Sequence, residues 1–381
     1  MTKRTRPRWI VRLGTLALFG GLFAFMAGAG SLCFFQFAPP EQTCLSCHEI
    51  QEPYNRWAAS THRTVSCKRC HGGTLTSGLH GLEENLKRLF AHFRDTDHGD
   101  MRLSEEQVVA INNQCGQCHA REFAHWLGGG HGINYPAIFL DEKHNKTEQI
   151  AEDCLRCHGM FFEGPVGEVV QPLDIKGPWR LKDAKLADRP VIPCLACHQV
   201  HVAGHPFASS ADRREKPDEA AATDRRDAVC LYSRRERTHF AAADLPVPKI
   251  EDQGRPVQVS TDPRQRVCVQ CHAPNAYGEA GTGDDRTPLG VHEGLSCAAC
   301  HAPHSNDARA SCVQCHPKLS NCGLDVTKMD TTFRSPESRH DIHWVRCADC
   351  HAAGVPVKPS EKTSAGAAGK AETKSGDAAN K

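Results

Sequence analysis

Residues 44–73 read CLSCHEIQEPYNRWAASTHRTVSCKRCHGG and hold two C-x-x-C-H motifs. A histidine directly follows each cysteine pair, and His62 stands between the two motifs. C-x-x-C-H is the attachment motif of c-type haem: the two sulfurs bond to the haem vinyl groups, and the histidine binds the iron from one side. The stretch therefore predicts two covalently bound haems.

The rest of the chain repeats this motif. Nine copies account for 18 of the 21 cysteines among 381 residues. Disulfides do not require a histidine after each pair, and structural zinc takes ligands from a second, separate knuckle. We therefore expect nine c-type haems. Their attachment sites are Cys44, Cys47, Cys67, Cys70, Cys115, Cys118, Cys154, Cys157, Cys194, Cys197, Cys268, Cys271, Cys297, Cys300, Cys312, Cys315, Cys347 and Cys350. Their iron ligands are His48, His71, His119, His158, His198, His272, His301, His316 and His351.

The composition favours a fold that packs around these haems. Hydrophobic residues make up 39% of the chain and aromatic residues 6%, with 31 Gly and 23 Pro. A soluble chain of this length normally builds a larger apolar core. We predict a mostly α-helical protein with extensive loop and almost no β-sheet. Leu79 to Phe93 show helical spacing of apolar residues, and Ser104 with Gln107 form a capping box for a helix leading into Cys115.

The N-terminus carries a membrane signal. A basic flank, residues 1–8, precedes 23 uncharged residues from Leu13 to Phe35, which is long enough to cross a bilayer. The basic flank predicts a cytoplasmic N-terminus and a haem domain in the periplasm, anchored to the bacterial inner membrane. A cleaved signal peptide is the alternative, but its apolar region is shorter and no A-x-A site lies near residue 38.

The spacing of the motifs divides the chain into segments. Residues 1–38 form the flank and anchor, and residues 39–205 a module of five haems. Residues 206–265 contain a charged linker and the loop CLYSRRERTHF, and residues 266–354 form a module of four haems. Residues 355–381 are rich in Lys, Ala, Ser and Gly and are expected to be disordered.

Fourteen histidines lie outside the motifs and are candidates for the second axial iron ligand. His62, His292 and His343 each stand shortly before a motif, and His201 and His304 follow one as C-H-x-x-H. A histidine so placed cannot easily fold back to its own iron, so it should bind a neighbouring haem. His125, His131, His144 and His239 are further candidates. A surface or hydrogen-bonding role is the alternative, and it is favoured for His80, His92, His98, His205 and His340.

The N-terminal stretch resembles the NapC/NirT family of membrane-anchored quinol dehydrogenases. The resemblance rests on the two motifs behind a single anchor and on Tyr54, Trp57, Ser60 and His62. It implies that haems take electrons from membrane quinol and pass them to periplasmic reductases. Ile50 stands where some members have a methionine ligand. Residues 296–316, SCAACHAPHSNDARASCVQCH, resemble the doubled module of multihaem cytochromes, and the chain has more haem motifs than a simple NapC.

These features favour an electron relay from the quinol pool to a periplasmic or outer-membrane redox protein, with no nucleic-acid partner. One alternative is an oxidoreductase that acts on a small nitrogen or sulfur compound at one open haem beside the loop CLYSRRERTHF. Another is a purely structural relay subunit. Lys68, Arg69 and Glu49 are possible quinol contacts, although solvated charges explain them better.

Two weaker patterns remain in the sequence. Cys230 and Cys322 lie outside the motifs and can pair with each other, stay free or bind iron. Asp95, Asp97 and Glu106 loosely follow a calcium loop, but Gly99 sits one place early, so an exposed acidic turn is the better interpretation.

Overall fold

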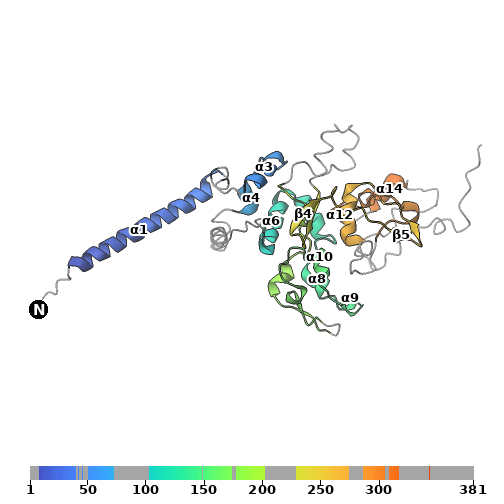
Figure 1. Cartoon of the computed structure of the whole chain (residues 1–381), viewed down its shortest axis with the longest axis horizontal. Coiled ribbons are helices and arrows are strands. Elements are labelled where there is room, and N and C mark those ends of the chain that lie inside the picture. The colour runs from blue at the N-terminus through green and yellow to red at the C-terminus, as the bar shows by residue number, and fades with distance from the viewer. Residues whose placement is uncertain are drawn as a thin grey trace, which may run out of the picture.

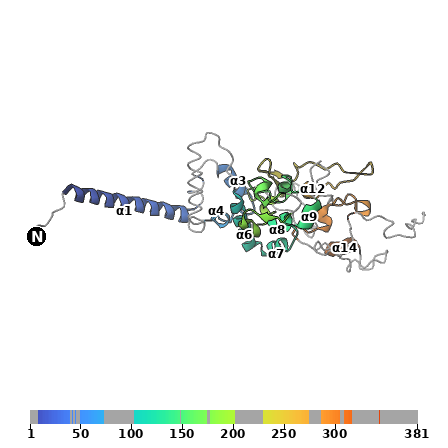
Figure 2. The same ribbon diagram turned by 90° about the horizontal axis from the view of Figure 1, so that it is seen from below.

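The computed structural model describes residues 8–39, 42, 45, 50–72, 103–147, 149–173, 177–201, 229–273, 286–304, 309–316 and 343. A long helix, α1 (Arg8–Phe37), projects from a body of short helices and loops (Figures 1 and 2). Its apolar part, Arg12–Phe34, is long enough to cross a membrane, and none of it is buried against the body. The anchor predicted from the sequence therefore has a matching helix.

The body is mostly helix and loop, as the sequence predicted. Its α-helices are α3 (Gln51–Ala59), α4 (Cys67–His71), α6 (Glu105–Cys118), α7 (Ala120–Leu127), α8 (Tyr135–Phe139), α9 (Glu142–Thr147), α10 (Cys154–Cys157), α12 (Pro263–His272), α13 (Cys297–Cys300) and α14 (Arg309–Cys315). Short 3₁₀ turns are η2 (Val166–Glu168), η3 (Ala184–Asp188), η4 (Cys194–Ala196) and η7 (Gly290–His292). Each cysteine pair that the structure describes lies in one of these helices or turns, or at the end of one.

Sheet is confined, among the described residues, to three two-stranded antiparallel hairpins. They are β1 (Val170–Gln171) with β2 (Arg180–Leu181), β3 (Cys230–Ser233) with β4 (Thr238–Ala241), and β5 (Glu251–Asp252) with β6 (Arg255–Pro256). In the second hairpin, Cys230 pairs with Ala241 and Tyr232 with His239. This hairpin is the loop CLYSRRERTHF of the sequence.

The predicted helix before Cys115 is confirmed as α6. The Ser104 hydroxyl accepts a hydrogen bond from the Gln107 backbone N–H, and the Gln107 side chain accepts one from the Ser104 N–H at 3.1 Å. This reciprocal capping box satisfies two backbone donors that a helix start leaves without partners. It fixes where α6 begins and hence how its C-terminal Cys115 and Cys118 are presented.

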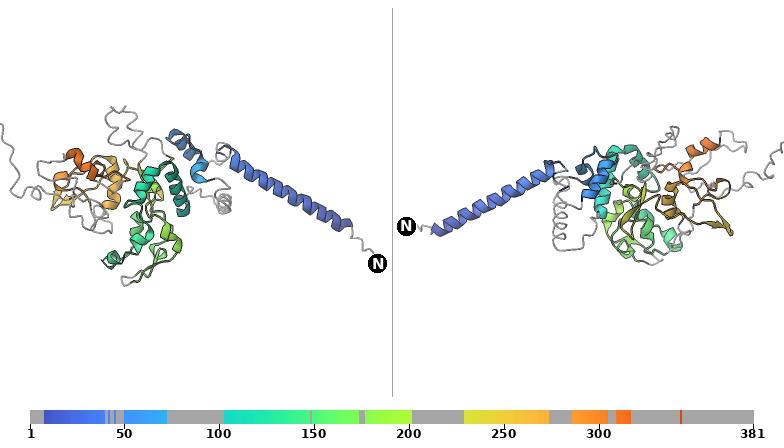
Figure 3. Two further views of the ribbon diagram at one scale, coloured as in Figure 1. Left: turned by 180° about the vertical axis from the view of Figure 1, so that it is seen from behind. Right: turned by 45° about the horizontal axis from the view of Figure 1, so that its top comes forward.

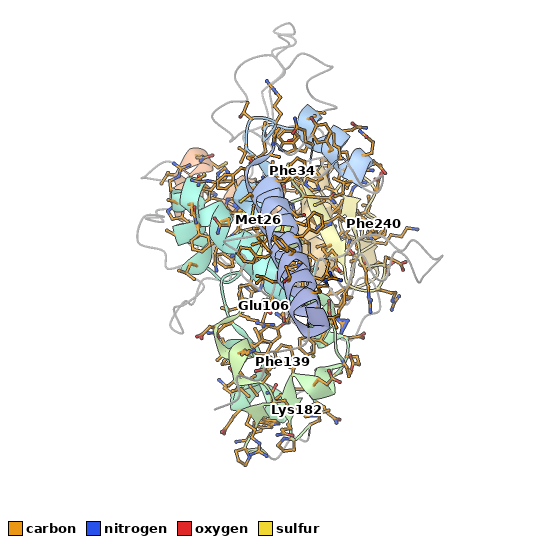
Figure 4. The ribbon with its side chains drawn as sticks, turned by 90° about the vertical axis from the view of Figure 1, so that its left-hand side faces the viewer. Met26, Phe34, Glu106, Phe139, Lys182 and Phe240 are labelled. Atoms are coloured by element: carbon orange, nitrogen blue, oxygen red, sulfur yellow. The ribbon has the colours of Figure 1, made fainter. Side chains whose placement is uncertain are left out.

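The apolar core is divided into small clusters. The largest lies in the lobe of residues 133–192 and centres on Tyr135, Phe139 and Leu155. Figure 4 views the molecule along α1 and shows this lobe, with Phe139 and Lys182 labelled, below the rest of the body. Smaller clusters surround Val108 with Ile111, and Ala242 with Val267. Such small cores fit the expectation that haems supply further apolar packing surface.

A buried polar group ties this lobe to α6. The Glu105 carboxylate accepts a hydrogen bond from the Tyr135 hydroxyl. It also forms an ion pair with Arg189, whose Nη1 lies 2.7 Å from Glu105 Oε2. Burial and the neighbouring Glu105 raise the pKa of Tyr135, so its hydroxyl stays protonated. Buried charges are tolerated when they are paired in this way.

Several predicted features lie outside the described residues. They are the motifs at Cys44–His48 and Cys347–His351, the helix over Leu79–Phe93, Cys322, most of the charged linker, the tail, and Glu49, Asp95, Asp97 and Gly99. Glu106, the last member of the weak calcium pattern, lies in the first turn of α6.

Candidate haem sites and their axial ligands

We number the nine C-x-x-C-H motifs in chain order, so that motif 1 begins at Cys44 and motif 9 at Cys347. Motifs 2 to 8 lie within the described residues. In six of these seven, the motif histidine faces the ring of a histidine from elsewhere in the chain. The pairs, with their ring-centroid distances, are His71 and His201 (5.9 Å), His119 and His62 (6.1 Å), His198 and His304 (5.9 Å), His272 and His131 (6.1 Å), His301 and His343 (6.0 Å), and His316 and His292 (6.3 Å).

This separation suits one iron between two imidazoles. A metal bond to an imidazole nitrogen is about 2 Å long, so two rings on opposite sides of one iron have centroids roughly 6 Å apart. Direct ring stacking in proteins spans about 4.5–7 Å, but six pairings that each join a motif histidine to a non-motif histidine follow the haem pattern. The residues present therefore fit a haem iron with two histidine ligands.

Burial keeps several of these rings neutral, which is the form that binds a metal. Burial, followed by the nearby His71 and Arg56, lowers the pKa of His201 to about 4. Burial also lowers the pKa of His131, with a smaller effect from His304. Burial therefore favours the neutral form of these imidazoles, which is the form that binds iron.

The histidine of motif 4, His158, lies near His144. Burial and then the nearby His144 lower the pKa of His158 to about 4. His158 Nδ1 is buried and has no hydrogen-bond partner among the described residues. His144 comes from α9, whose start is fixed by the Asp141 carboxylate accepting from the His144 N–H at 2.8 Å. The lobe thus brings a second histidine toward the motif 4 histidine.

The loop before motif 2 is built to hold His62. The Ser60 hydroxyl accepts a hydrogen bond from the His62 N–H at 3.1 Å and donates to the Trp57 carbonyl at 2.7 Å. Trp57 Nε1 donates to the Val65 carbonyl at 3.1 Å and closes the loop. Trp57 and Ser60, two residues that carry the NapC/NirT resemblance, therefore position the ring that faces His119 of motif 3.

A different set of contacts positions His292. Glu293 accepts two hydrogen bonds from Arg255, at 2.7 and 2.8 Å, and one from the Gln258 N–H at 2.8 Å. Gly294 follows with φ of +82°, a conformation that side-chain-bearing residues rarely adopt. The β5–β6 hairpin thus fixes the turn that carries His292 toward motif 8. No local sequence pattern indicated this support, because Arg255 and Glu293 are far apart along the chain.

Two predicted candidates do not join a motif histidine among the described residues. His239 Nε2 lies 2.7 Å from the Leu195 carbonyl, inside motif 5, and its ring packs on Tyr232. His125 lies on the exposed side of α7. Arg234, in the same hairpin as His239, donates to the Gly164 carbonyl at 2.6 Å. The hairpin CLYSRRERTHF therefore braces motif 5 and the lobe.

Comparison with known families gives two matches. Residues 40–207 match the family described as outer membrane cytochrome MtrC/MtrF-like, domains II/IV, and residues 232–302 match the family described as cytochrome c554 and c-prime. The chain is a multihaem c-type cytochrome. Covalently bound c-type haem and an electron-transfer role follow for this cytochrome from both matches. No curated protein and no solved structure matches the chain.

The cysteines of the cytochrome bring several of its motifs together. The sulfurs of Cys115 in motif 3 and Cys194 in motif 5 lie beside each other. Cys70 of motif 2 lies near Cys115 and Cys118, and Cys300 of motif 7 lies near Cys312 and Cys315 of motif 8. Neighbouring motifs, and with them their haems, are therefore in close proximity.

Two remaining predicted residues have definite surroundings. Lys68 Nζ, in motif 2, donates to the Ala38 carbonyl at 2.7 Å, directly after the end of α1. Cys230 is buried, and its N–H donates to the Cys197 carbonyl of motif 5 at 3.0 Å. Burial, followed by the nearby Cys197, raises the pKa of the Cys230 thiol. Cys322 lies outside the described residues, so pairing with it stays one of the three alternatives for Cys230.

Proposed function

We propose that this cytochrome carries nine haems and relays electrons from membrane quinol, along the haem array, to a periplasmic or outer-membrane acceptor. The observation that carries the proposal is the set of six histidine pairs, each of which joins one motif histidine to one histidine outside the motifs. The two histidines of each pair would hold a haem iron from both sides and would leave no ligand position for a substrate.

The haems, when bound, supply one-electron chemistry, and the chain sets their spacing, axial ligands and burial. Motifs 2, 3 and 5 are joined through Cys70, Cys115 and Cys194. Motifs 5, 6, 7 and 8 continue through Cys197, Cys268, Cys297, Cys300 and Cys312. Close contacts of this kind between motifs are what electron hopping along a chain of haems requires.

Electron entry is proposed at the anchor. Lys68 holds motif 2 against the residue that follows α1, and a cationic side chain is favourable at the carbonyl end of a helix. If α1 spans the inner membrane, haem 2 and its neighbours stand at the membrane surface, within reach of quinol. The NapC/NirT resemblance of residues 44–73 supports this assignment. The match of residues 40–207 to an outer membrane cytochrome model supports an acceptor on the outer side.

Catalysis at an open haem has less support. The side chains that this alternative needs are already engaged, with His239 on the Leu195 carbonyl and Arg234 on the Gly164 carbonyl. The described motif histidines of the six pairs each face a second ring. A relay subunit that never meets quinol is the remaining alternative, and it differs from the proposal only in where the electrons enter.

Quinol-driven reduction of haem in membranes tests the proposal. Vesicles containing the full chain are compared with the chain lacking residues 1–38 added to the same vesicles. We expect quinol to reduce the haems of the full chain and to reduce those of the shortened chain much more slowly, while dithionite reduces both completely. Failure of quinol to reduce the haems of the full chain, while dithionite reduces them, would favour the passive subunit.

A further inference from the structure

Motif 6 stands at the meeting point of three other motifs. It forms the C-terminal part of α12, which lies between the N-terminal part of the body and the helices α13 and α14 in Figures 1 and 3. Its histidine, His272, faces His131 from the N-terminal half of the chain. A motif at the end of a linear array would contact one other motif, whereas motif 6 contacts three.

The contact with motif 7 runs through a cap and a thiol. The Asp262 carboxylate caps α12 and also accepts a hydrogen bond from the Ser296 hydroxyl at 2.7 Å. The same Ser296 hydroxyl caps α13, which carries motif 7. At the other end of this contact, Cys268 shares a hydrogen bond with Cys297. Two helix starts and two haem-attachment sites are therefore fixed against each other.

The contact with motif 5 is apolar. Val267, directly before motif 6, belongs to a buried cluster with Ala242 and Leu245, and Cys197 of motif 5 packs against that cluster. The histidine pairs also bring motifs 5 and 6 together. His131, which faces motif 6, lies near His304, which faces motif 5.

The contact with motif 4 reaches the lobe of residues 133–192. The sulfur of Cys271 lies beside that of Cys157, and the guanidinium of Arg156 lies close to the same sulfur. Motif 4 is therefore joined directly to motif 6, although motif 5 lies between them in the sequence.

We propose that haem 6 is a three-way junction of the electron path, with haems 4, 5 and 7 as its direct neighbours. Electrons that arrive from the membrane side through haem 5 divide at haem 6. One branch leads into the lobe through haem 4, and the other leads through haem 7 to haem 8. This inference rests on the proposed relay function and gives the cytochrome two outlets instead of one.

The test labels haem 6 and then perturbs one neighbour at a time, in the full-length haem-loaded protein. The label is His131→Met, since methionine ligation raises the reduction potential of a haem, so that haem 6 is reduced first and titrated separately. The first perturbation is Arg156→Gln, which keeps every haem and removes one positive charge beside Cys271. We expect the midpoint potential of the labelled haem to fall, because a nearby positive charge favours the reduced iron.

Arg69→Gln is the matched control. Arg69 occupies in motif 2 the position that Arg156 occupies in motif 4, and it should leave the labelled potential unchanged. A second perturbation removes haem 4 through Cys154→Ala with Cys157→Ala, compared with the removal of haem 2 through Cys67→Ala with Cys70→Ala. The first deletion should shift the labelled potential and the second should not.

The outcomes separate the two proposals. Absence of any methionine-ligated haem in His131→Met would contradict the histidine pairing on which the relay function rests. A methionine-ligated haem whose potential ignores both Arg156→Gln and the loss of haem 4 would overturn the junction alone. A response to the loss of haem 2 as large as that to the loss of haem 4 would also overturn it.

Discussion

At the scale of single residues, the presence of one imidazole ring decides whether a haem iron has a free ligand position. His201 is half-buried and faces His71, whereas His125 is exposed on α7. We predict that His201→Ala creates one haem that binds carbon monoxide in the reduced protein, because one axial position becomes free. The carbon monoxide difference spectrum measures this change.

The matched control for that experiment is His125→Ala, which should bind no more carbon monoxide than the parent protein. Equal binding by the two variants would show that His201 is not an axial ligand.

His239 illustrates a candidate histidine that contacts a backbone carbonyl instead of a motif histidine. Its ring nitrogen shares a hydrogen bond of 2.7 Å with the Leu195 carbonyl inside motif 5. We predict that His239→Phe lowers the free energy of unfolding by about 1–3 kcal/mol, because a buried carbonyl loses its partner. Thermal unfolding measures the loss, and the visible spectrum should show every haem still six-coordinate. A new five-coordinate haem would instead identify His239 as a ligand.

At the scale of elements, helix starts place the haem-attachment cysteines. Removing the capping hydroxyl through Ser104→Ala should cost about 1 kcal/mol of stability, as is usual for the loss of an N-cap. Ser104→Asp should restore most of that loss, because aspartate is an equally good cap. Melting temperatures of the three proteins test this prediction, and a Ser104→Ala variant as stable as the parent would contradict it.

The Asp262 carboxylate caps the start of α12 and makes a pH-dependent contribution to the stability of the protein. Burial opposes its charge, but hydrogen bonds from Arg264 and Ser296 outweigh that effect and lower its pKa below the ordinary 3.8. A lowered pKa means that the unfolded chain binds the proton more readily. The stabilisation is therefore fully present above pH 3.8 and is lost as the pH falls through the folded-state pKa.

Substitutions at Asp262 separate its two roles. Asp262→Asn keeps a capping side chain and loses the charge, so its stability should depend less on acid than that of the parent. Asp262→Ala loses both and should be less stable at neutral pH by about 1 kcal/mol or more. Acid unfolding curves of the three proteins measure this, and identical curves for Asp262→Asn and the parent would contradict it.

Local patterns in the sequence were enough to predict these elements. The motif spacing predicted the haem-bearing turns, and Ser104 with Gln107 predicted the start of α6, because both signals lie within a few neighbouring residues. The five best-patterned histidines, His62, His201, His292, His304 and His343, each face a motif ring. The spacing did not predict which motif each one faces, since that depends on packing between distant segments.

The same limit explains what the sequence missed. Arg255 with Glu293 and Asp262 with Ser296 are ordinary residues in sequence, and only the tertiary structure makes them supports of His292 and motif 7. His131 lacked the pattern of a histidine close to a motif, yet it faces His272, about 140 residues further along the chain. His239 was a reasonable candidate by count, and its hydrogen bond to Leu195 became apparent only in the fold.

At the scale of the whole molecule, the two halves of the chain exchange histidines. His131, from the N-terminal half, faces motif 6, and His304, from the C-terminal half, faces motif 5. We predict that the halves stay together after cleavage at a protease site inserted within residues 206–227, because both iron centres bridge them. Size-exclusion chromatography of the cleaved haem-loaded protein measures this.

The variant carrying both His131→Ala and His304→Ala supplies the comparison, since its cleaved fragments should separate more readily. Fragments of the parent that separate freely in mild buffer would contradict the exchange of ligands.

Electron paramagnetic resonance of the fully oxidised, full-length protein tests the central claim most directly, because it distinguishes irons with two strong axial ligands from irons with an open position. Motifs 2 to 8 each bring a second histidine toward the motif histidine, and motifs 1 and 9 lie outside the described residues. The account predicts low-spin signals from at least seven irons per chain. High-spin ferric signals that integrate to three or more irons per chain would contradict it.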